Sequence, residues 1–412
     1  MGNDSGLNCL IEKGDVAMEM RYWIWLSTAL GAGSRRAEDI LRHFANPQEL
    51  YEQIQTSTAP FPPLTASDYQ RFRRTPLSQA ERILEQCARL SIDVVTPQNS
   101  DYPQRLLPLS SLPLVLYKKG DISVLNKHFT ITVVGSRSVT HYGRTLAQQI
   151  SYDLAEQGIV VVSGMALGGD EAAHIGALNA GGITVAILGC GLDVDYPKEH
   201  RILKEQVLEQ GALISEYPPG SEPVGAHFPV RNRILSGVSN SVLIVECGER
   251  SGALITANHA LEQGRDVFAV PGQVIGAPIG TFGLLRDGAV PVRNAEDILS
   301  YYDFLRERKK KQSLKRAVSQ SLLQKSPKQK KSPERTKADA SSSDLQKKEQ
   351  DVIGRISSDA RFIYEKMPSA PIGVEELMQC TGLSIGMLFS VLTELEVDGL
   401  ISALPGGRYQ KQ

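Results

Sequence analysis

The sequence has few cysteines, and their spacing fits neither a metal site nor a disulfide framework. Five cysteines, Cys9, Cys87, Cys190, Cys247 and Cys380, are scattered along 412 residues and form no CxxC or Cys/His pattern. A sparse and odd number of cysteines is typical of reduced thiols. The sequence therefore predicts no structural metal, no disulfide bonds and a cytoplasmic location.

Long apolar runs and a Walker A loop are also missing. No stretch approaches the roughly 20 apolar residues of a membrane span, and no basic segment leads into an apolar one as in a signal peptide. No Gly-Lys dipeptide occurs, which excludes a P-loop nucleotidase. The formal net charge of −1 neither requires nor excludes a polyanionic partner. We expect no membrane contact.

The middle of the chain alternates short apolar runs with amphipathic stretches. The runs predicted as strands are 130–134, 159–162, 184–188, 212–215, 241–245 and 266–270, and the stretches predicted as helices are 145–157, 172–180, 200–210 and 254–264. This alternation predicts an α/β fold with a Rossmann-like, doubly wound, mostly parallel sheet. The strands are apolar throughout, so both faces of the sheet should be covered. We place this domain at residues 100–302.

Two smaller domains and a linker are predicted around it. Residues 20–95 have helical spacing and a glycine-containing turn at 30–34, which resembles helix–hairpin–helix and SAM-like folds. Turn amides of this kind can bind phosphate, but we favour a packing role. Residues 306–348 contain fifteen Lys or Arg against four Asp or Glu and almost no large apolar residues. We therefore predict a basic, disordered linker at 303–350.

The last sixty residues predict a winged helix-turn-helix domain at 351–412. Three helical segments are followed by two short strands around Gly406 and Gly407. The third helix, 385–396, is apolar and acidic and has no Lys or Arg. Such a helix is a poor reader of the major groove, whose phosphates and base acceptors favour basic side chains. We expect an accessory role, not sequence-specific recognition.

The loops that follow the strands are where a doubly wound sheet binds ligands. After the first strand come Gly135, Ser136 and Arg137, and after the second come Ser163 and Gly164, in turns suited to phosphate. Asp170 should cap the next helix. A further small-residue anion turn lies at 249–253. The Gly-x-Gly at 189–191 lacks the third glycine of a dinucleotide fingerprint, so we predict no cofactor.

The segment HFPVRNRILSG, 227–237, concentrates basic and aromatic residues, and we interpret it as a loop. Phe228 can stack on an unpaired base, Arg231 and Arg233 can contact phosphates, and the Asn232 amide can address a base edge. Basic and aromatic side chains together suit single strands more than duplexes. In the competing interpretation, Phe228 covers the core and the arginines pair with Glu246 or Glu249.

These motifs, in this order, resemble the DNA-processing protein family DprA, also called Smf. The resemblance rests on GSR, SGMALGGDEAAHIGAL, ILGCGLDVDYP, ISEYPPG, FPVRNRILSGVS and GERSGALITANHALEQGRDVFAVPG, between residues 102 and 299. It implies a non-enzymatic cytoplasmic protein that binds and protects single-stranded DNA, loads RecA recombinase in natural transformation and forms a homodimer. It also implies a strand-binding pocket formed by Gly135, Ser136, Arg137, Ser163, Gly164, Phe228, Arg231, Asn232 and Arg233.

Departures from the family pattern occur at three positions. Leu167 stands where the family has Arg or Lys, Gly169 where Ile or Val is common, and Phe282 near a place where Asn is usual. A missing cation at residue 167 should lower the slope of log affinity for DNA against log salt concentration by about one.

Two other functions compete with DNA binding. A phosphoribohydrolase on a related Rossmann-like fold would need a carboxylate in the loop pocket, and Glu246 is the candidate. A transcriptional regulator would use the winged helix, against which the acidic third helix argues. Tight binding to single strands would favour the DNA-binding hypothesis, and turnover of nucleoside monophosphates would favour the phosphoribohydrolase hypothesis.

Overall fold

The computed structural model describes most of the chain outside its first residues and the linker. The described residues are 19–44, 46–272, 279–303 and 358–411, the last with gaps at 369, 371, 382–387, 389–390, 393, 397–399 and 405–407. Two compact units, Met1–Gln320 and Ser321–Gln412, are considered separately. Apart from Asp303, the predicted linker lies outside the described residues. Within the described ranges, no helix is both long and apolar enough to cross a membrane.

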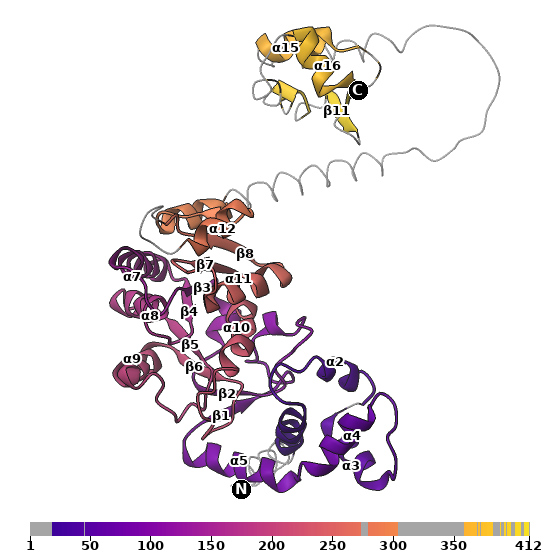
Figure 1. The fold of residues 1–412 in the computed structure, drawn as a ribbon, viewed down its shortest axis with the longest axis vertical. Coiled ribbons are helices and arrows are strands. Elements are labelled where there is room, and N and C mark those ends of the chain that lie inside the picture. The colour runs from indigo at the N-terminus through magenta and orange to yellow at the C-terminus, as the bar shows by residue number, and fades with distance from the viewer. Residues whose placement is uncertain are drawn as a thin grey trace, which may run out of the picture. The chain divides into compact units, whose positions relative to one another are not determined.

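The first unit is built around a nine-stranded sheet in the order β1-β2-β6-β5-β4-β3-β7-β8-β9 (Figure 1). Its strands are β1 (Asp93–Val95), β2 (Leu116–Gly120), β3 (Thr130–Val134), β4 (Val160–Ser163), β5 (Thr184–Leu188), β6 (Ala212–Ser215), β7 (Ser241–Ile244), β8 (Asp266–Ala269) and β9 (Val290–Pro291). Pairing is parallel from β6 to β9 and antiparallel for β1–β2 and β2–β6. The predicted Rossmann-like, mostly parallel sheet is confirmed.

Helices cover both faces of this sheet, as the apolar strands predicted. Every residue of β3 and of β5 is buried. Figure 1 shows α7, α8 and α9 on one face and α10 and α11 on the other. The helices and helical turns of this region are η1 (Gln104–Leu106), α6 (Val124–Lys127), α7 (His141–Glu156), α8 (Gly169–Asn179), η2 (Lys198–His200), α9 (Arg201–Gln210), α10 (His227–Gly237), α11 (Gly252–Glu262) and α12 (Gly280–Arg286). Residues 295–303 are also helical.

Gly176 sets how closely α7 and α8 pack. A Cβ atom at this position would lie 2.1 Å from the carbonyl oxygen of Gln148, so only glycine allows the contact. We expect Gly176→Ala to lower the free energy of unfolding by about 1–3 kcal/mol, because the backbones must separate. Urea denaturation measures this. Gly283→Ala is the control, since nothing lies within 4 Å of that position in α12; equal destabilisation of the two variants would contradict the packing argument.

The N-terminal helices pack against the sheet. Residues 19–30 form the first helix, followed by α2 (Arg36–Leu41), α3 (Pro47–Thr56), α4 (Ala66–Arg74) and α5 (Leu77–Arg89). Asn46 caps α3, and Thr65 with Asp68 forms a capping box on α4. Trp25, in the first helix, belongs to the same apolar core as Leu188 at the end of β5. The helical region and the sheet therefore share one core.

The second unit has the winged-helix elements that the sequence predicts. It contains α15 (Ser358–Lys366), β10 (Ile372–Gly373), α16 (Val374–Thr381), β11 (Ile401–Leu404) and β12 (Arg408–Lys411). The strands form a sheet in the order β10-β12-β11. Of the predicted third helix, residues 388, 391–392 and 394–396 are described and helical, whereas 385–387 lie outside the described residues. Leu388, Leu392 and Leu395 are buried against the other helices.

Candidate functional site

A cavity of about 480 Å³ lies where the sheet reverses its direction of winding. β3 and β7 are neighbours, and the chain leaves them toward opposite edges of the sheet. Ligands of open α/β sheets bind at this kind of switch point. The cavity is lined by the loops after β3 and β7 and by α8, α10 and α11. Six of the nine predicted site residues line it: Gly135, Ser136, Arg137, Phe228, Arg231 and Asn232.

Asp170 is a buried carboxylate that joins the two glycine-rich loops. Its oxygens accept hydrogen bonds from the backbone N–H groups of Gly164 (3.1 Å), Ala166 (3.4 Å) and Gly135 (3.4 Å). The predicted N-cap role is corrected, because α8 begins before Asp170 and Gly168 is its N-cap. Burial raises the pKa of Asp170, and the positive charge of Arg231 opposes that shift.

Arg231 is the buried cation that faces Asp170, and it is 4% exposed. Its Nη1 donates to the carbonyl oxygens of Gly164, at 2.8 Å, and of Ile187, while its Nε donates to Asn232 Oδ1 at 3.1 Å. A Cβ atom on Gly164 would lie 2.7 Å from both the Arg231 guanidinium and the Asp170 carboxylate. A side chain at residue 164 would therefore displace one of these two buried charged groups. Arg231 therefore connects the loop after β4 to β5 inside the protein and does not extend into solvent.

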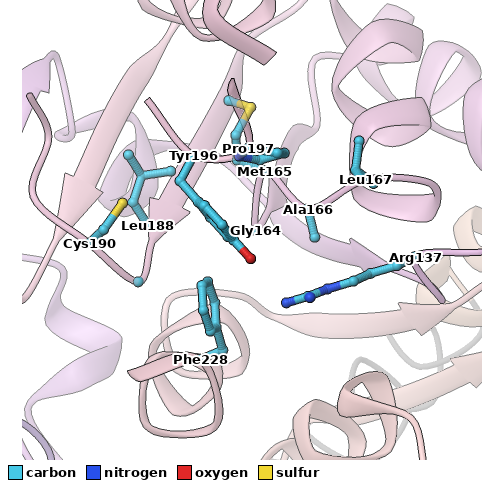
Figure 2. Close-up of a pocket in the computed structure, with 11 residues that line it drawn as sticks. Arg137, Gly164, Met165, Ala166, Leu167, Leu188, Cys190, Tyr196, Pro197 and Phe228 are labelled. Atoms are coloured by element: carbon cyan, nitrogen blue, oxygen red, sulfur yellow. The ribbon is translucent and has the colours of Figure 1, made fainter. Parts of the chain in front are cut away.

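Phe228, Tyr196 and Arg137 meet at a smaller pocket of about 30 Å³ beside the cavity (Figure 2). The ring centroids of Phe228 and Tyr196 are 5.4 Å apart, and the Arg137 guanidinium lies 5.4 Å from the Phe228 ring centroid. This cation–π contact orients Arg137 without neutralising its charge. Gly164 and Leu167 also line this pocket. A volume of 30 Å³ holds about one water molecule, and the pocket shares Arg137, Ala166 and Phe228 with the larger cavity.

Two exposed arginines supply unneutralised charge to the cavity. Arg137 follows β3 and Arg250 follows β7, and in the described ranges neither has an ion-pair partner. The N-terminus of α11 lies beside Arg250, and Ser251 caps it by accepting from the Ala253 N–H. A helix N-terminus and two free guanidinium groups favour an anion. The sequence identified the turn at 249–253 but not Arg250; its place after a parallel strand was the available signal.

The structure corrects the interpretation of 227–237 as a loop, because these residues form α10. Pro229 lies in the first turn, where a missing N–H is tolerated. Helical periodicity turns Arg233 away from the cavity. Its Nη2 donates to both carboxylate oxygens of Glu216, at 2.6 and 2.8 Å, in a buried ion pair. Glu216, and not Glu246 or Glu249, is the partner.

Three other predicted residues have all or part of their polar groups engaged. Ser163 is buried, lines neither pocket, and donates its hydroxyl to the Val133 carbonyl oxygen at 2.7 Å. The Asn232 amide donates to the Gly252 carbonyl oxygen at 3.1 Å, which joins α10 to α11. The Ser136 N–H donates to the Glu246 carbonyl oxygen at 2.7 Å. These contacts shape the cavity walls.

Glu246, the acid that the phosphoribohydrolase hypothesis requires, does not line the cavity. Its carboxylate accepts from the Thr140 N–H at 2.9 Å and from the Thr140 hydroxyl at 2.6 Å, so it anchors the start of α7. In the part of the chain that the structure describes, no group of three His, Cys, Asp or Glu residues could hold a metal ion.

Fold and site together define a class: a doubly wound α/β protein with a cationic cavity at its switch point, joined to a winged-helix unit. Comparison with known families narrows this further. The model of the DNA recombination-mediator protein A family matches residues 93–303, and that of the DprA winged helix domain matches residues 336–407. The chain belongs to the DNA recombination-mediator protein A family, also called DprA or Smf, as its motifs predicted.

Individual relatives agree with this assignment. Protein Smf of Synechocystis sp. is 31% identical over 413 residues, which cover 96% of this chain and 99% of the relative. DNA processing protein DprA of Streptococcus pneumoniae is 41% identical over 204 residues, or 49% of this chain and 72% of that protein. A crystal structure of DprA from Streptococcus pneumoniae superimposes with a TM-score of 0.59 at 32% identity, covering 68% of this chain and 97% of that one.

Proposed function

We propose that this chain binds single-stranded DNA, without sequence preference, in the cavity between β3 and β7. The observation that carries the proposal is the pairing of two unneutralised guanidinium groups, Arg137 and Arg250, with the aromatic side chains of Phe228 and Tyr196. The guanidinium groups and the α11 N-terminus would bind phosphates, and the aromatic rings would stack a base. Bases are available for stacking in a single strand and hidden in a duplex.

The nine site residues predicted from the sequence would then have different roles. Arg137 would contact the strand directly, with Gly135 and Ser136 presenting backbone groups beside it. Arg231, Asn232 and the glycine at 164 would hold the walls that the strand touches. Ser163 and Arg233 would act from outside the cavity, through the strand and helix that carry them.

The remaining functions rest on what the family implies. We propose that the protein acts in the cytoplasm, protects incoming strands, delivers them to the RecA recombinase in natural transformation, and works as a homodimer without catalysis. Light scattering measures the dimer, and strand exchange by RecA on coated oligonucleotides measures delivery. Release of a base from nucleoside monophosphates would instead favour the phosphoribohydrolase hypothesis.

Titration of labelled oligo-dT and a matched duplex across a salt series tests DNA binding. We expect Arg137→Gln and Arg250→Gln each to weaken binding of oligo-dT and to lower the slope of log affinity against log salt by about 0.7. Arg201→Gln is the control, because Arg201 is exposed on α9 and pairs with Glu205. If both cavity variants bind with the wild-type affinity and slope, the assignment of the site is wrong.

A further inference from the structure

Helix α10 borders a second cavity on the side opposite Phe228. This cavity measures about 310 Å³, within the range of small-molecule sites. It lies between the N-terminal helical region, the segment before β2 and the ends of α10 and α11. Polar side chains dominate its wall: Arg35, Ser110, Ser111, Arg233, Gln263 and Arg265.

Several buried polar atoms of this wall have no partner among the described residues. Arg233 is 4% exposed, and only its Nη2 is used by Glu216, so Nε and Nη1 are unpaired. Arg265 Nε and Gln263 Oε1 are also buried and unpaired. Buried donors without acceptors cost free energy. Three donors and one acceptor on residues of this wall therefore lack a partner in the described part of the chain.

The charges around the cavity leave an excess of positive charge. Glu216 neutralises Arg233, and Glu262 lies 3.5 Å from His259 at the rim. Arg35 and Arg265 have no carboxylate partner in the described part of the chain.

Arg265 is held by backbone groups alone. Its Nη2 donates to the carbonyl oxygens of Arg105 and Gly237, and among the described residues it has no carboxylate partner. Burial lowers the pKa of Arg265, and it also lowers the pKa of Arg105, whose charge the Arg265 guanidinium further disfavours. Of these two groups Arg265 lines the cavity, so an anion bound there would stabilise its charge.

We propose that this second cavity binds a phosphate group. A phosphate oxygen can accept from the guanidinium groups of Arg233 and Arg265, which line the cavity, and a protonated phosphate oxygen can donate to the side-chain amide oxygen of Gln263. The Ser110 and Ser111 hydroxyls can rotate and add two donors. Arg35, from the N-terminal helical region, adds a further positive charge. The site shares no lining residue with the cavity between β3 and β7, and it does not rest on the proposed DNA binding.

Two sources share this chemistry: a free phosphate or mononucleotide, and the backbone of a DNA strand. Calorimetric titration of the full chain with inorganic phosphate and with thymidine 5′-monophosphate tests the first. The salt series with oligo-dT tests the second. Arg250→Gln serves as the comparison, because it alters only the other cavity.

We expect Arg265→Gln to weaken phosphate binding by about tenfold, the loss of one charge-assisted hydrogen bond. Because Arg265 also holds two carbonyl oxygens, Arg35→Gln is a second variant; the Arg35 side chain is exposed and makes no hydrogen bond or ion pair with the described residues. A loss of phosphate or mononucleotide affinity in Arg35→Gln identifies a free ligand. A lower oligo-dT salt slope in Arg35→Gln identifies the DNA backbone.

The proposal is overturned if Arg35→Gln and folded Arg265→Gln bind phosphate, the mononucleotide and oligo-dT as the wild type does. It is also overturned if only Arg250→Gln reduces phosphate binding.

Discussion

Arg231→Met is expected to lower the free energy of unfolding by about 3–5 kcal/mol, the cost of leaving a buried charge without its counter-charge. Asp170 would keep its three backbone hydrogen bonds but lose the opposing cation, and the carbonyl oxygens of Gly164 and Ile187 would lose their donor. Denaturation in urea, followed by circular dichroism, measures the change. Methionine keeps most of the buried volume, so the loss reports charge and hydrogen bonding.

The destabilisation of Arg231→Met should depend on pH. Burial already raises the pKa of Asp170, and Arg231 is the charge that opposes this shift. Without Arg231 the folded-state pKa rises further above its unfolded value, so the folded state binds the proton more tightly. The variant should therefore recover stability as the pH falls through this raised pKa. A destabilisation that is independent of pH would show that Asp170 is not the group left unpaired.

Arg137→Met is the matched control for Arg231→Met. Arg137 is exposed, and its side chain contacts the Phe228 ring but makes no hydrogen bond or ion pair within the described ranges, so the same substitution should leave stability within about 0.5 kcal/mol of the wild type. Loss of DNA binding in Arg231→Met would therefore indicate that the wall of the cavity between β3 and β7 is disrupted. Loss in Arg137→Met would indicate that a direct contact with DNA is missing. Only folded variants can assign DNA contacts.

Breaking the ion pair between Arg233 and Glu216 is the second change expected to lower the free energy of unfolding strongly. We expect Glu216→Leu to destabilise the protein by about 3–5 kcal/mol, because the guanidinium of Arg233 stays buried and unpaired. Adding Arg233→Met should restore most of that loss, since the buried charge is then removed. If the double variant is less stable than Glu216→Leu, the Arg233 side chain has another partner, such as an anion in the neighbouring cavity.

Fluorescence separates two consequences of breaking this pair. The chain has two tryptophans, Trp23 and Trp25, and both lie in the helix at 19–30. Glu216 also faces the turn of the helical region, where the Gly33 N–H lies 3.5 Å from its carboxylate. Tryptophan emission in Glu216→Leu should therefore change at lower urea concentration than circular dichroism does. Coincident transitions would mean that the helical region and the sheet still unfold together.

Much of the fold could be predicted from the sequence because its strands are locally encoded. The ranges 130–134, 184–188 and 212–215 match β3, β5 and β6 to the residue. Each is a short apolar run between turn residues, and such a run needs no distant contact to be recognised. β2 was not predicted, because the prolines before it suggested a linker. Its antiparallel pairing with β6 is a contact made across almost a hundred residues.

Within the candidate site, the sequence determined which loops meet but not which side chains face the ligand. Parallel strands end at one edge of a sheet, so the loops after β3 and β7 had to converge there. The segment at 227–237 was different, because it was interpreted as one of the loops, whereas burial against β3 and β5 makes it a helix. Arg231 and Arg233 then lie on different sides of one helix, and each finds a separate buried partner.

The sequence by itself determined that this chain has a Rossmann-like sheet with phosphate-favouring turns, between a helical region and a winged helix. Local patterns of apolar residues and glycines suffice for that. Only the tertiary structure decided that Arg231 and Arg233 are buried while Arg137 and Arg250 remain free, and that two separate cavities flank α10. An arginine binds a phosphate only through N–H groups that no carboxylate or carbonyl within the protein already holds. Those partners, Asp170, Gly164 and Glu216, come from distant parts of the chain.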